Sequence, residues 1–192
     1  MSAPPTALFR QASRLYMVLV VLGLAWIAWR GGELGTNLLI SPHWVRDLGA
    51  GLAGGATLLG AWWLVARLSA TARRLEDELV ALTGPLRVDE AYALAFFSAI
   101  AEEVFFRGAM LPAWGLLAST VLFGVLHIGP GRSFLVWTAS ALIAGWGLGA
   151  LTLWAGGALL APIAAHALVN AVQLPRLARR ANQAHAAAPP EG

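Results

Sequence analysis

Three charged residues interrupt a long apolar segment and limit what this chain can fold into more than any other feature. Glu102, Glu103 and Arg107 lie within residues 91–117, which are otherwise almost entirely apolar. A charged side chain at the centre of a bilayer costs ~2.5–3.5 kcal/mol on insertion scales. On a helix Glu103 and Arg107 are four residues apart, so they share a face and can pair. Glu102 lies about 100° around the helix axis from Glu103, so its side chain can face a different group.

The composition of the chain is that of a membrane protein. Of its 192 residues 58% are hydrophobic and only 12% are charged, which indicates an all-α, polytopic membrane helix bundle. Apolar segments predict about six transmembrane helices, at residues 15–29, 48–66, 91–110, 115–128, 133–154 and 158–174. The absence of cysteine excludes disulfides and a cysteine nucleophile. The basic residues cluster in loops and tails, which indicates membrane topology rather than nucleic-acid binding.

These segments divide one integral membrane domain into four parts. Residues 1–66 hold a tail and two transmembrane helices, and residues 91–175 hold a core of four helices that contains the three charged residues. Between them, residues 67–90 repeat leucine at helical spacing among charges, which predicts an amphipathic helix in the membrane interface; these leucines are Leu75, Leu79, Leu82 and Leu86. Residues 176–192 are rich in alanine and contain two prolines near their end, and we expect them to be disordered.

The arginines predict the orientation in the membrane. With six spans, ten arginines fall on the side of the two termini, and only Arg30 and Arg46 fall on the other side. Because positive charge accumulates in cytoplasmic loops, we expect both termini in the cytoplasm.

Two further predicted spans carry polar residues inside the membrane. Residues 115–128 contain Phe123 and His127, and residues 158–174 contain His166 and Asn170. Each pair is spaced four apart and shares a helix face. A count of residues along each helix places Glu102, His127, His166 and Asn170 at a similar depth in the membrane. A single histidine inside a membrane often only makes a hydrogen bond between helices. Four polar groups at matched depth predict a site.

The residue types in this set fit the hydrolysis of a peptide bond. A glutamate beside a histidine can deprotonate a water molecule. A second histidine with a nearby amide can donate hydrogen bonds to a developing oxyanion. Alternatively, Glu102, His127 and His166 could hold Zn²⁺ with an open coordination position. The sequence contains neither an H-E-x-x-H motif nor a G-x-S-x-G motif, and Ser98 is not placed as a nucleophile.

Three short motifs resemble those of a known family. E-E-x-x-x-R at Glu102, F-x-x-x-H at Phe123 and H-x-x-x-N at His166 are similar to the motifs of the CPBP family of CAAX-processing and bacteriocin-processing intramembrane proteases, which includes Rce1-type endopeptidases. The resemblance covers about residues 75–174. It implies Glu102 as the catalytic glutamate, His127 as the group that activates water, and His166 with Asn170 as the oxyanion site. It further implies supporting roles for Glu103, Arg107 and Phe123.

The resemblance implies an intramembrane endopeptidase acting on a membrane-associated protein or peptide. We expect the lipid bilayer of a bacterial inner (plasma) membrane as its surroundings, no nucleic-acid partner and no cofactor, with zinc as the alternative. A different function is also compatible with the sequence. A non-catalytic immunity or scaffold protein could use the same polar cavity to bind a partner helix.

Overall fold

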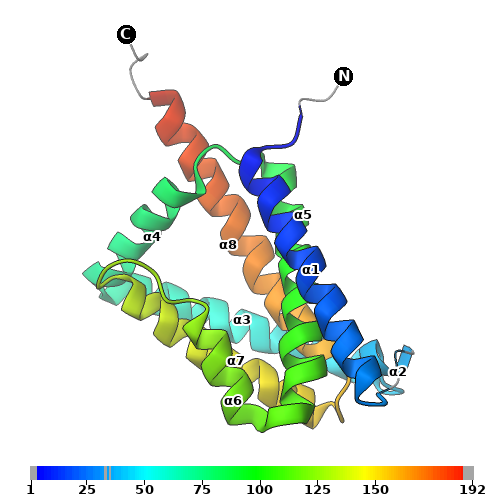
Figure 1. Cartoon of the computed structure of the whole chain (residues 1–192). Helices are drawn as coiled ribbons and strands as arrows, with labels where there is room; N and C mark the ends of the chain where they lie inside the picture. The colour runs from blue at the N-terminus through cyan, green and yellow to red at the C-terminus, as the bar shows by residue number, and fades with distance from the viewer. Residues whose placement is uncertain (1–3, 33, 35, 188–192) are drawn as a thin grey trace.

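The computed structural model describes residues 4–32, 34 and 36–187, and within these ranges the chain is helical without a strand. The elements shown in Figure 1 are α1 (Ala7–Trp29), α2 (Thr36–Leu39), α3 (Trp44–Leu68), α4 (Ala70–Thr83), α5 (Val88–Glu102), the π-helix η1 (Glu103–Met110), α6 (Leu111–Val125), α7 (Phe134–Trp154) and α8 (Leu160–Ala187). The predicted all-α class is confirmed.

Four segments are long and apolar enough to cross a membrane. They are Ala7–Trp29, Trp44–Leu68, Val88–Val125 and Phe134–Trp154. The third predicted span and most of the fourth fall in Val88–Val125, where a kink at Gly115, whose φ is 82°, separates two helical stretches. Residues 126–128 of the fourth predicted span lie beyond this segment. The sixth predicted span forms the first half of α8, which is not among the four segments. The structure is thus a polytopic helical membrane bundle.

Helix α8 packs against α3 on one side and against α5 on the other, and α1 runs along α5 and η1 (Figure 1). Two glycines allow the contact between α3 and α8. A Cβ on Gly51 would lie 2.3 Å from the carbonyl oxygen of Ala161, and one on Gly55 would lie 2.7 Å from that of Ala165. The absence of a side chain at these two positions therefore permits the close contact of α3 with α8.

The predicted amphipathic segment forms α4, which is shorter than residues 67–90. The helix begins after Ser69, whose side chain caps it by accepting from the backbone N–H of Ala72, and it ends at Gly84, where φ is 57°. Leu75 and Leu86 are buried, whereas Leu82 is 63% exposed. The predicted segment thus contains a helix over Ala70–Thr83, and its position in the membrane interface stays a prediction.

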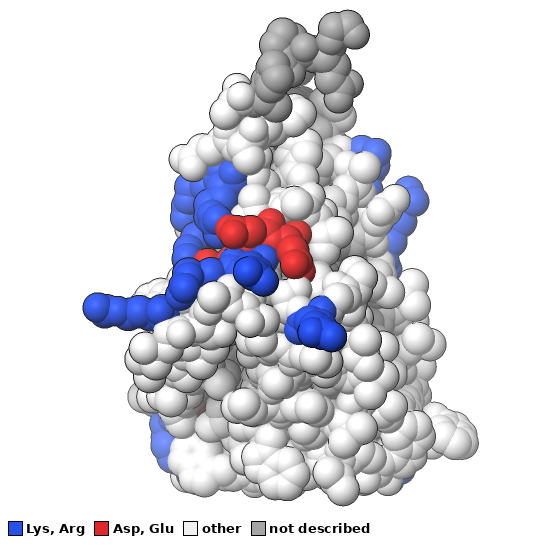
Figure 2. All heavy atoms as spheres, turned by 90° about the vertical axis from the view of Figure 1, so that its left-hand side faces the viewer, with Lys and Arg blue, Asp and Glu red and all other residues white. Residues whose placement is uncertain are grey.

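The predicted disordered tail is wrong for residues 176–187, which continue helix α8 to Ala187. This part of α8 is held by contacts with α4 and the start of α5. Arg176 pairs with Glu76 at 3.0 Å, and the Asn182 amide donates to the Leu86 carbonyl at 2.9 Å. Figure 2 shows the acidic and basic side chains of this region as a band across one face. Residues 188–192 lie outside the described part of the chain.

Candidate active site

All four residues predicted to be catalytic line one cavity of about 330 Å³. They come from three places that are distant in sequence. Glu102 is the last residue of α5, His127 lies in the turn after α6, and His166 and Asn170 lie one turn apart on α8. The packing of α8 against α5 brings two of the three motifs together.

A buried ion pair lies beside this cavity, as the spacing predicted. Arg107 Nη1 lies 2.9 Å from Glu103 Oε1, and the two side chains are 1% and 0% exposed. The second terminal nitrogen of Arg107 donates to the Gly145 carbonyl at 3.1 Å. The guanidinium carbon lies 4.4 Å from the ring centroid of Phe123, a cation–π distance. Arg107 thus joins η1 to α6 and α7.

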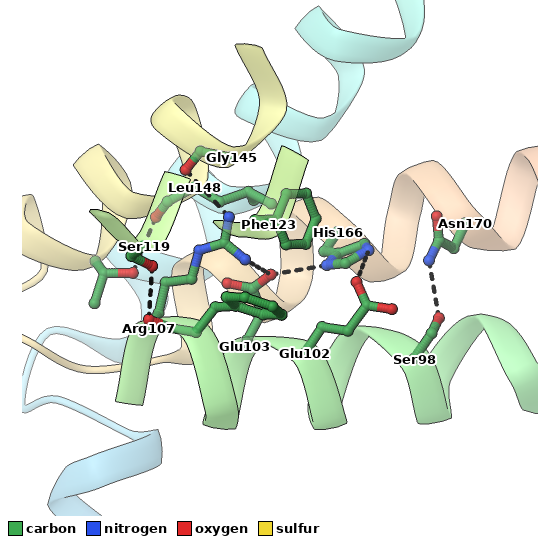
Figure 3. Close-up of polar contacts among 12 residues, drawn as sticks. Ser98, Glu102, Glu103, Arg107, Ser119, Phe123, Gly145, Leu148, His166 and Asn170 are labelled. Atoms are coloured by element: carbon green, nitrogen blue, oxygen red, sulfur yellow. Dashed lines mark hydrogen bonds and ion pairs between the residues drawn. The ribbon is translucent and has the colours of Figure 1, made fainter. Parts of the chain in front are cut away.

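His166 connects the two adjacent glutamates, a contact that sequence reasoning missed. Its Nδ1 lies 2.8 Å from Glu103 Oε1, and its Nε2 lies 3.9 Å from Glu102 Oε2. Figure 3 shows the imidazole between the two carboxylates. An ionised carboxylate only accepts hydrogen bonds, so Nδ1 of His166 carries a proton and donates a hydrogen bond to Glu103. Glu103 therefore both pairs with Arg107 and orients a predicted catalytic ring.

The ring of His127 is oriented by the backbone of its own motif. Its Nδ1 lies 2.7 Å from the carbonyl oxygen of Phe123. Because a carbonyl can only accept, Nδ1 is the protonated nitrogen, and Nε2 of the neutral ring is left as an acceptor. The imidazole contacts the tilted rings of Phe123 and Trp137, with centroid distances of 4.6 and 5.7 Å. Phe123 therefore contacts both Arg107 and His127.

Asn170 is held by a serine that the sequence analysis considered only as a nucleophile. The Asn170 Nδ2 group donates to Ser98 Oγ at 2.9 Å, and Ser98 is 2% exposed. Ser98 lies four residues before Glu102 and hence on the same helix face, which is the one sequence feature that could have indicated its place. In Figure 3 the pair lies next to Glu102 and His166.

The acidic motif also has an unusual backbone. The helix changes from α to π at Glu103, and the π-helix extends to Met110. π-Helical turns are rare and occur frequently at functional sites. The change falls between Glu102 and Glu103, so the two adjacent carboxylates belong to different helical geometries. Nothing in the sequence pattern predicted it.

The zinc alternative requires Glu102, His127 and His166 to face one metal ion together. Among the described residues, no group of three His, Cys, Asp or Glu side chains is arranged to hold a metal ion. One ring nitrogen of His127 bonds to a backbone carbonyl, and one of His166 bonds to Glu103. In this arrangement Glu102, His127 and His166 line one cavity together without forming such a group.

A comparison with protein families places the same residues in a known context. The model of the family described as type II CAAX prenyl endopeptidase Rce1-like matches residues 87–172. No curated protein and no solved structure gave a significant match. The matched segment contains all three motifs, and the family match indicates a CAAX-type protease in a membrane. Residues 87–172 are therefore an Rce1-like segment, and the resemblance predicted from the three motifs is confirmed.

Proposed function

We propose that the protein is an intramembrane endopeptidase that hydrolyses a peptide bond of a membrane-associated protein or peptide. One observation carries the proposal. Glu102, His127, His166 and Asn170 come from motifs on three separate elements and line a single cavity. The Rce1-like match over residues 87–172 supports the same class of reaction.

In this mechanism Glu102 and His127 activate a water molecule. The carboxylate of Glu102 and Nε2 of His127 both accept hydrogen bonds, so a water between them can lose a proton as its oxygen attacks the peptide carbonyl carbon. The carbonyl oxygen takes up negative charge in the tetrahedral intermediate. The carbon–nitrogen bond then breaks, and the proton held by Glu102 or His127 passes to the leaving amine.

His166 and Asn170 stabilise the negative oxygen of that intermediate. With both ring nitrogens protonated, His166 donates to Glu103 through Nδ1 and can donate to the oxyanion through Nε2. Its positive charge is then balanced by the neighbouring carboxylates. The Asn170 amide has two N–H donors and uses one on Ser98, which leaves one for the oxyanion. Preorganised donors of this kind are usually a major source of rate enhancement.

The walls of the cavity suit an apolar substrate segment. Apart from the motif residues, most of the lining is apolar or aromatic and comes from α3, α7 and α8, including Leu58, Trp62, Val65, Trp137, Ile143 and Leu148. An apolar or lipid-modified peptide tail can displace water there. This agrees with the prenyl substrates named in the description of the matching family.

We further propose that the protein lies in a bacterial plasma membrane with both termini in the cytoplasm. The start of α1 and the end of α8 lie at the same end of the bundle in Figure 1. Two arginines, Arg30 and Arg46, follow the far end of α1 and lie away from the two termini. Arg30 lies near the Pro112 carbonyl, at 3.4 Å, and Arg46 lies over the ring of Trp154, at 4.3 Å. The remaining loop arginines then satisfy the positive-inside rule.

Substitution of two residues tests the proposal. The probe is an internally quenched peptide that ends in a prenylated C-A-A-X sequence, presented to purified protein in detergent micelles. Glu102→Gln should lose nearly all cleavage, because an amide cannot accept the proton. Asn170→Ala should keep slow turnover, since loss of one oxyanion donor typically lowers the rate ~10²–10³-fold. Glu78→Gln is the matched control, because Glu78 lies on α4 outside the cavity and its amide replacement can still accept from Ser133. Cleavage by Glu102→Gln at the wild-type rate would refute the proposal.

A further inference from the structure

The hydroxyl of Ser98 has one hydrogen-bonding position left after its two observed partners. It donates its proton to the Ala95 carbonyl at 3.1 Å and accepts from Asn170 Nδ2 at 2.9 Å. A serine hydroxyl has one donor and two acceptor positions, so one lone pair is available for another donor. Ser98 is buried, so that donor has to come from the protein or from the cavity.

Tyr16 is the side chain placed to supply this donor. It lies on α1, outside the segment that matches the family, and it lines the same cavity as Glu102 and Asn170. Ser98 lines this cavity as well, so the two side chains share it. The ring of Tyr16 packs against an apolar cluster formed by Leu86, Ala91, Leu94 and Ala178. The ring is therefore anchored in the protein core while the hydroxyl faces the active-site cavity.

A fixed partner matters for Asn170 because a carboxamide turns easily. The terminal torsion of asparagine is broad, and without a bond to one N–H the amide can present either its oxygen or its nitrogen to the substrate. The bond to Ser98 selects the nitrogen on one side and thereby fixes the direction of the second N–H. A hydrogen bond donated by the Tyr16 hydroxyl to Ser98 Oγ would hold the serine hydroxyl in the orientation that accepts from Asn170.

We propose that Ser98 and Tyr16 are positioning residues that hold the Asn170 carboxamide toward the oxyanion. The first helix, which carries none of the three motifs, then completes the active site. This inference rests on the proposed function for its catalytic consequence, but the hydrogen-bond chain itself can be tested without a substrate.

The first test is nuclear magnetic resonance of protein labelled with ¹⁵N-asparagine. The chain has three asparagines, Asn37, Asn170 and Asn182, so the side-chain amide spectrum is simple, and Asn170→Ala assigns the signal of interest. We expect Ser98→Ala and Tyr16→Phe each to shift the Asn170 amide pair and to leave the Asn182 pair in place. Tyr92→Phe, which changes the other tyrosine of the chain, is the control. An Asn170 signal unmoved by Tyr16→Phe would overturn the role of Tyr16.

The second test measures kinetics with the prenylated C-A-A-X probe. Ser98→Ala should lower kcat ~10-fold or more with little change in KM, as expected for a contact used in the transition state. In an Asn170→Ala background the same change should have no further effect, because Ser98 acts through Asn170. If Glu102→Gln is inactive but Ser98→Ala lowers kcat further in the Asn170→Ala background, this inference fails and the proposed function stands. An active Glu102→Gln variant refutes the proposed function, and the spectra then decide the hydrogen-bond chain independently.

Discussion

Replacement of Arg107 by alanine should destabilise the protein by several kcal/mol, because three contacts of its guanidinium are lost together. It pairs with Glu103, donates to the Gly145 carbonyl and stacks on Phe123. Breaking a buried ion pair by removing one partner costs ~3–5 kcal/mol, since a buried charge is left uncompensated. Loss of a buried cation–π contact adds up to ~2 kcal/mol. The sum is a large fraction of the ~5–15 kcal/mol that stabilises a typical folded protein.

The assay for Arg107 is the thermal unfolding of purified protein in detergent, together with folded yield. We expect Arg107→Ala to lower Tm strongly and to reduce the yield of monodisperse protein. Arg107→Lys should fall between the two, because a lysine can keep the charge but not both hydrogen bonds. Arg74→Ala, in an exposed position on α4, controls for the loss of a surface arginine. An Arg107→Ala protein with wild-type Tm and yield would refute the assignment of a stabilising ion pair.

Two other predictions concern packing and orientation. Gly51→Val should lower Tm by the equivalent of ~1–3 kcal/mol or more, because its Cβ would lie 2.3 Å from the Ala161 carbonyl oxygen. Gly49→Ala is the control and should not lower Tm, because its Cβ would meet nothing within 4 Å. Equal Tm values for the two variants would contradict the packing of α3 on α8. Reporter fusions at residue 185 should be active only with a cytoplasmic reporter, and activity of a periplasmic reporter at that position would reverse the proposed topology.

The parts of the site that follow from local spacing could be predicted from the sequence. Glu103 and Arg107 are four residues apart within an apolar segment, and pairing reduces the cost of burying two opposite charges. Matched depth along the helices was enough to predict that Glu102, His127, His166 and Asn170 could lie together.

The contacts that could not be predicted join residues far apart in sequence or depend on backbone geometry. The bond from His166 to Glu103 spans 63 residues, and that from Asn170 to Ser98 spans 72. Both depend on the rotation of α8 against α5, which no periodicity specifies. The π-helix at Glu103 leaves the hydrophobic pattern unchanged. The helical continuation beyond Arg176 is held by Glu76 of α4, a tertiary contact that composition does not reveal.

The central claim is that the side chains of this cavity activate water without a metal ion. Its most direct test is elemental analysis of active, purified protein, with a chelator titration of the same sample. We predict substoichiometric zinc and cleavage of the prenylated C-A-A-X probe that a chelator does not reduce. One equivalent of zinc per chain, removed together with activity and restored with it, would contradict the account and make Glu102, His127 and His166 metal ligands.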